Sequence, residues 1–146
     1  LRADLSAGAL TLLDLYRVFP FGNEVVSFLW TGEQLERVVE RALRGELGDD
    51  PAPLQWSGIT YRWTLREEAP VLLSLSVGGE PVDPGGEYRV ATNVFVSWQW
   101  ENLLGEPPLG SIEGHGMTVF EAAERSARSG DVGVPADKRS LRISAP

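Results

Sequence analysis

Hydrophobic residues recur at helical spacing in the segment that follows Thr31. The positions lie at i, i+3, i+4, i+7 and i+8, and are occupied by Leu35, Val38, Val39, Ala42 and Leu43. This spacing places them on one stripe of an α-helix, while the charged residues between them, including Arg37 and Arg41, face solvent. Thr31 and Gln34 have the spacing of a capping box, and Gly45 ends the pattern. We therefore predict a helix over residues 31–44, packed on a sheet through its apolar stripe.

Two more capping boxes predict helices near the two ends of the chain. Thr11 and Asp14 begin the segment TLLDLYRVF, which is interrupted by the turn-forming sequence PFGN at residues 20–23. Thr118 and Glu121 have the same spacing at the start of the segment MTVFEAAERSAR. The second of these segments is predicted to be the other main helix of the domain.

Runs of β-branched and aromatic residues predict the strands. They are EVVSFLW (24–30), ITYRWTL (59–65), VLLSLSV (71–77), EYRVATNVFV (87–96) and SLRIS (140–144). Gly78-Gly79 and the sequence DPGG supply hairpin turns, and residues 105–116 are expected to form a long loop. Short hairpin-linked strands with two main helices predict a single α+β domain with a mostly antiparallel or mixed sheet.

Composition narrows the possible functions. The 146 residues carry a net charge of −8, which disfavours binding to nucleic acid. No apolar run approaches the roughly 20 residues of a membrane span, and the chain has no cysteine for disulfides or thiolate metal sites. The chain begins LRADL without a methionine, and we interpret it as part of a longer protein.

The residues required for common catalytic sites are missing from the sequence. His115 is the single histidine, it lies between two glycines, and we interpret it as an ordinary surface residue. A hydrolytic two-metal site needs several Asp, His and Asn ligands. The sequence also has no Ser-His-Asp set, no catalytic cysteine and no phosphate-binding loop. This chain alone is therefore not expected to be catalytic or to bind a metal.

Five segments in order resemble the C-terminal domain of the 5′-nucleotidase family: LRADL, LYRVFPFGN, the Thr-Gly-capped helix, LQWSGITYRW and VGGEPVDPGGEYRVATNVF. Members of that family are two-domain hydrolases, usually exported. The resemblance implies that residues 1–146 form the domain that binds the nucleoside. It also implies that two divalent metal ions belong to an N-terminal catalytic domain absent from this chain, and that the protein is periplasmic or secreted.

The resemblance further implies substrate-binding roles for six residues: Arg2, Asn23, Phe95, Trp98, Trp100 and Glu101. Arg2 matches an arginine that reaches the ribose or phosphate side of the substrate. Phe95 matches a phenylalanine that stacks on the nucleobase, a contact that contributes about 1–3 kcal/mol. Without the resemblance, Phe95 would be interpreted as a core residue at the end of a strand. Asn23 would similarly be interpreted as a turn residue.

One motif departs from the family pattern. Gln99-Trp100-Glu101 replaces a Gly-Gly-Asp sequence, and the second stacking aromatic falls on Pro53. Glu101 retains a carboxylate, and we expect Phe95, Trp98 and Trp100 to lie near one concave surface close to Arg2. Two alternatives follow from the departure. Besides a parent protein that hydrolyses nucleoside phosphates, it allows a divergent member acting on cyclic nucleotides, nucleotide sugars or sulfur esters. It also allows a non-catalytic packing module whose base site is plugged by tryptophan.

Overall fold

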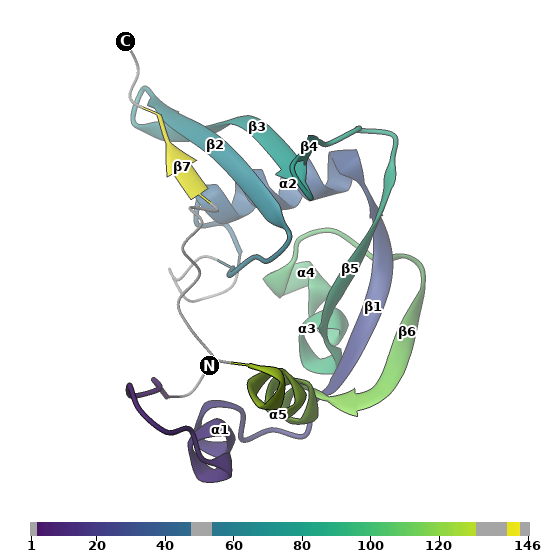
Figure 1. Ribbon diagram of the computed structural model, residues 1–146. Coiled ribbons are helices and arrows are strands. Elements are labelled where there is room, and N and C mark those ends of the chain that lie inside the picture. The colour runs from purple at the N-terminus through teal and green to yellow at the C-terminus, as the bar shows by residue number, and fades with distance from the viewer. Residues whose placement is uncertain (1–2, 48–53, 131–139, 144–146) are drawn as a thin grey trace.

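The computed structural model describes residues 3–47, 54–130 and 140–143, which form two sheets with helices around them (Figure 1). The helices are α1 (Leu12–Val18), α2 (Gly32–Leu43), α3 (Val94–Trp98), α4 (Trp100–Leu103) and α5 (Val119–Ser129). The strands are β1 (Glu24–Thr31), β2 (Ile59–Arg66), β3 (Ala69–Val77), β4 (Glu80–Pro81), β5 (Glu87–Asn93), β6 (Leu109–Thr118) and β7 (Ser140–Arg142). The predicted α+β class is confirmed.

The strands are divided between a three-stranded and a four-stranded sheet. The first has the order β5-β1-β6 and is antiparallel throughout. The second has the order β4-β3-β2-β7, in which β7 runs parallel to β2 and the other pairs are antiparallel. In the second sheet β2, β3 and β4 follow one another through tight turns, whereas β5, which follows β4, pairs with β1 in the first sheet.

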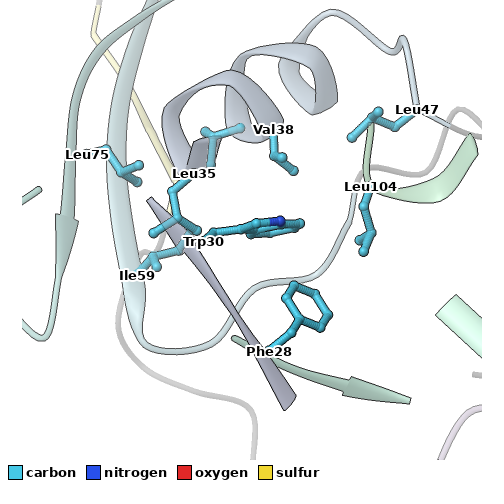
Figure 2. Close-up of a cluster of buried hydrophobic side chains, with 9 residues drawn as sticks. Phe28, Trp30, Leu35, Val38, Leu47, Ile59, Leu75 and Leu104 are labelled. Atoms are coloured by element: carbon cyan, nitrogen blue, oxygen red, sulfur yellow. The ribbon is translucent and has the colours of Figure 1, made fainter. Parts of the chain in front are cut away.

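The core lies between the two sheets and includes the apolar stripe of α2 (Figure 2). Phe28 and Trp30 project from the same face of β1, and their rings meet edge to face at a centroid distance of 5.1 Å. They pack with residues from α2 and from the second sheet, including Leu35, Val38, Ile59 and Leu75. The stripe predicted for this helix is thus confirmed at its buried positions.

The three predicted capping boxes are present. The side chains of Thr11, Thr31 and Thr118 accept hydrogen bonds from the backbone three residues later, at the starts of α1, α2 and α5. In each case the side chain of that third residue accepts a hydrogen bond from the backbone amide of the threonine. These contacts satisfy amide groups that a helix otherwise leaves unpaired at its first turn.

The predicted strand over residues 87–96 is too long. β5 ends at Asn93, and Phe95 lies on α3. The side chain of Asn93 accepts a hydrogen bond from the Val96 amide at 3.0 Å, and the Ser97 hydroxyl donates to the Val94 carbonyl at 2.9 Å. Asparagine is a favoured N-cap, and here it starts a helix inside a run of β-branched and aromatic residues.

The loop predicted over residues 105–116 is also wrong over most of its length, because residues 109–118 form β6. This strand pairs with β1 at the edge of its sheet and exposes nearly all of its side chains. It therefore lacks the alternation of apolar and polar residues that marks a half-buried strand. Glu24 of β1 supports the pairing by accepting a hydrogen bond from the Gly116 amide at 2.8 Å.

Candidate functional site

The candidate site lies at the end of the three-stranded sheet where α3 and α5 begin (Figure 1). The register pairs Val25 with Asn93 and Glu24 with Thr118, which brings together the start of β1 and the ends of β5 and β6. Asn23 immediately precedes this point, and its carbonyl accepts a hydrogen bond from the Val119 amide at 2.9 Å. Its backbone carbonyl therefore helps to fix the start of α5.

Phe95 and Trp98 form an exposed aromatic face on α3. Residues three apart are neighbours on a helix surface, so the two side chains share one side of α3 without any bend in the chain. Phe95 is 49% exposed and Trp98 is 75% exposed. The other side of the helix is held in the domain by Ser97, which is fully buried, and by Val96, which packs against the core.

Trp100 and Glu101 have different surroundings. Trp100 is partly buried and packs against the core, whereas Glu101 is exposed in the first turn of α4. Gln99 separates α3 from α4 with φ −102° and ψ 30°, a conformation that does not require glycine. The Gln-Trp-Glu sequence is therefore accommodated by two consecutive short helices, and Trp100 belongs to the packing of the domain.

A cavity of about 600 Å³ is present between the sheets. Core residues Trp30, Leu35 and Ile59 line it together with residues 54–58, residues 88–92 of β5, and Val96. The described lining does not include Phe95, Trp98 or Trp100. Val96 thus faces this cavity, whereas Phe95 and Trp98 on the aromatic face of α3 do not. Arg2 and Pro53 lie outside the described residues.

Polar side chains of α2 bind the segment that follows α4. Arg37 donates to both carboxylate oxygens of Glu106, at 2.8 and 3.0 Å. Arg41 donates to the Gly105 carbonyl at 2.7 Å, and Gln34 donates to the Pro107 carbonyl at 3.0 Å. We call these three side chains, with residues 105–107, the α2 clamp. The side chains of Arg37 and Arg41 remain 43% and 35% exposed, in line with the predicted polar side of the helix, but both also reach this segment.

Glu106 should make stability depend on pH. Its hydrogen bond with Arg37 holds the pKa of the carboxyl below its usual range. Because the folded-state pKa is lowered, the stabilisation is present above the unfolded-state pKa and is lost as pH falls through the folded value. We expect Glu106→Gln to be less stable than wild type at pH 7 and the difference to shrink below about pH 4.

Denaturant unfolding of both proteins between pH 7 and pH 3 measures this difference. The same comparison in an Arg37→Gln background provides the control, since Glu106 then has no bidentate partner. A difference between wild type and Glu106→Gln that stays constant with pH would contradict this assignment.

His115 contributes to a polar cluster on the three-stranded sheet. Its Nε2 atom lies 2.9 Å from the hydroxyl of Ser27, which also accepts a hydrogen bond from Arg89 at 3.2 Å. Arg89 forms an ion pair with Glu113 at 2.7 Å. Ser27 is 1% exposed, so it is closed to a substrate. His115 is therefore a surface residue that also contacts Ser27 of the neighbouring strand β1.

The described residues do not fit a metal centre. Among them, no three or more His, Asp or Glu side chains come together in a way that could hold an ion. In the same part of the chain, no helix is both long and apolar enough to cross a membrane.

Comparison with known proteins places residues 1–104 in the family model described as 5′-nucleotidase, C-terminal domain. The NAD 5′-nucleotidase of Haemophilus influenzae is 30% identical over 106 residues, which cover 66% of this chain and 18% of that protein. Endonuclease YhcR of Bacillus subtilis is 28% identical over 125 residues, which cover 82% of this chain and 10% of that protein. The chain thus spans less than a fifth of the length of these two relatives.

Solved structures share the fold. A 5′-nucleotidase precursor from Thermus thermophilus superimposes with a TM-score of 0.76 and 24% identity, covering 99% of this chain and 30% of the other. The sulfate thiohydrolase SoxB of Thermus thermophilus gives a TM-score of 0.65 and 24% identity, covering 92% of this chain and 25% of the other. The same arrangement of sheets and helices therefore occurs within much longer chains.

Proposed function

Because the chain belongs to the 5′-nucleotidase C-terminal domain family, we propose that it is the nucleoside-binding domain of a metal-dependent phosphoesterase that hydrolyses nucleoside phosphates. The observation that carries the proposal is the aromatic face of α3. Phe95 and Trp98 expose 49% and 75% of their surface on a helix whose other side is anchored in the core. An exposed aromatic pair is suited to stacking on a flat ring.

The exposure of this face favours binding over the packing-module alternative. In that alternative, the aromatic rings fill the old base site and are themselves buried. Trp100 does pack against the core, but Trp98 and Phe95 do not have the low exposure that a plug requires. A base that stacked on these rings would remove apolar surface from water, which is the physical source of its affinity.

Polar residues would complete the recognition of the nucleotide. We assign the ribose or phosphate side to Arg2, whose guanidinium is suited to bidentate contacts with an anion. Glu101 is exposed two residues after Gln99 and has a carboxylate that can accept hydrogen bonds from ribose hydroxyls. Asn23 lies at the same end of the sheet as α3 and completes the assigned set.

The chemistry itself belongs to a second domain in this proposal. Two divalent metal ions there would activate water and polarise the phosphate ester. The residues described above would bind and orient the nucleoside, and the whole protein would act in the periplasm or outside the cell. The net charge of −8 is consistent with a small nucleotide, rather than a nucleic acid, as the partner.

Hydrolysis assays on the whole protein and on residues 1–146 test the proposal. The whole protein, supplied with manganese, should release phosphate from nucleoside monophosphates faster than from sugar phosphates without a base. Residues 1–146 alone should show no turnover with the same metal. Equal rates with and without a base would contradict the nucleoside-binding role. Turnover by residues 1–146 alone would contradict the assignment of catalysis to a second domain.

A further inference from the structure

The position of the aromatic face depends on two short helices. α3 has five residues and α4 has four, and Gln99, the N-cap residue of α4, makes no side-chain cap hydrogen bond. Helices of this length are not stable by themselves in water. Their geometry must therefore be imposed by the segments at either end.

The N-terminal end of this segment is fixed by the sheet. Asn93 is paired with Val25 in the β1–β5 ladder, and its side chain caps α3. This contact sets where α3 begins. It does not by itself determine the position of α4.

The C-terminal end is fixed by the α2 clamp. Its three donors belong to a 12-residue helix whose apolar stripe is buried in the core, so they are presented from a rigid element. Trp30 adds a further hydrogen bond from its ring N–H to the Pro107 carbonyl at 3.0 Å. Leu104, next to the clamp, is only 4% exposed. Residues 104–107 are thus held by both packing and hydrogen bonds.

Gly105 shows how closely this segment approaches α2. Its φ is +77°, a conformation that favours glycine. A Cβ atom added there would lie 2.1 Å from Nη1 of Arg41 and 2.9 Å from Cδ2 of Leu47. The Gly105 carbonyl can reach Arg41 because no side chain separates them.

The ion pair of the clamp is unequally exposed. The Glu106 side chain is 14% exposed, whereas that of Arg37 is 43% exposed. Removing Arg37 would leave a mostly buried carboxylate without its bidentate partner, which favours movement of residues 105–107 toward water. Such a movement would also displace α4, because the Trp100 carbonyl accepts hydrogen bonds from the Leu104 and Gly105 amides.

We propose that Arg37, assisted by Gln34 and Arg41, is a positioning residue that holds α3 and α4 in the orientation that binds the nucleoside. This role rests on the proposed function, since it assumes that the aromatic face is the binding surface. Arg37 acts through Glu106 and the segment 104–107. Its loss should therefore weaken binding while the core remains folded.

The test compares Arg37→Met with Arg37→Lys and with Arg44→Met. Lysine keeps the charge but loses the bidentate geometry. Arg44 is the matched control, because it pairs with Glu40 at 3.7 Å near the end of the same helix, where that pair is exposed. Hydrogen exchange of the amides of residues 94–104 and adenosine affinity are measured for each variant, and circular dichroism verifies that each is folded.

Arg37→Met should speed exchange in α3 and α4 and weaken adenosine binding, each by about tenfold, the effect of losing a charge-assisted bidentate contact. Arg37→Lys should fall between wild type and Arg37→Met, and Arg44→Met should match wild type.

Unchanged exchange in Arg37→Met would overturn the positioning role. Unchanged adenosine affinity would overturn it equally, provided that wild type binds adenosine. If wild type binds no nucleoside, the proposed function fails, and exchange alone then decides whether Arg37 holds this segment.

Discussion

Val39→Asp should lower the free energy of unfolding by about 3–5 kcal/mol, because it places an unpaired carboxylate in the core. Val39 is 1% exposed and packs in the cluster formed by α2 and the two sheets. The cluster in which Val39 packs consists of hydrophobic side chains. Denaturant unfolding followed by circular dichroism measures the change.

Glu33→Asp is the matched control for this substitution. It places the same aspartate on α2, at an exposed position in the first turn, where an acidic residue is favourable. Its unfolding free energy should stay within about 0.5 kcal/mol of wild type. A similarly small change in Val39→Asp would mean that the apolar stripe of α2 does not face the core.

Phe95→Ala should weaken adenosine binding by about 1–3 kcal/mol, or roughly 5-fold to 150-fold, through loss of base stacking. The effect on folding should be small, because the side chain is half exposed on the outer side of α3. Calorimetric titration of residues 1–146 gives the affinity. In the whole protein, the Michaelis constant for a nucleotide should rise by a comparable factor.

Leu73→Ala provides a control for the removal of exposed apolar surface. Leu73 is 47% exposed, close to the value for Phe95, and lies on β3 in the other sheet. It should leave both adenosine affinity and the Michaelis constant unchanged. A Michaelis constant that is also unchanged in Phe95→Ala would remove the stacking role.

Elements with strong local signals could be predicted from the sequence. α2 has both a capping box and a periodic apolar stripe, and the two signals agree with its packing. The Gly78-Gly79 turn is similar, since both residues adopt positive φ, as a two-residue hairpin requires. In these segments local preference and tertiary environment favour the same conformation.

The errors occurred where these two influences differ. Residues 94–98 have β-branched and aromatic side chains typical of a strand, but the Asn93 cap and the burial of Ser97 make them helical. β6 is exposed along most of its length and owes its conformation to pairing with β1. Neither the cap nor the pairing produces hydrophobic periodicity, so a pattern-based prediction missed both.

The candidate site was predictable only in part. Resemblance to the family supplied Phe95, but the exposure of Trp98 and the packing of Trp100 depend on where α3 ends and α4 begins. The α2 clamp was not predictable, because Arg37 and Glu106 are 69 residues apart. A single sequence does not show which of several arginines on a helix will meet a distant glutamate.

The most direct test of nucleoside binding is the tryptophan fluorescence of residues 1–146 during titration with adenosine and with cytidine. Trp98 shares the exposed side of α3 with Phe95, so a base stacked there should change its emission. Saturable quenching by both nucleosides, much reduced in Phe95→Ala, is the predicted result, because stacking tolerates different bases. Emission that does not respond to either nucleoside, or an identical response in Phe95→Ala, would contradict the account.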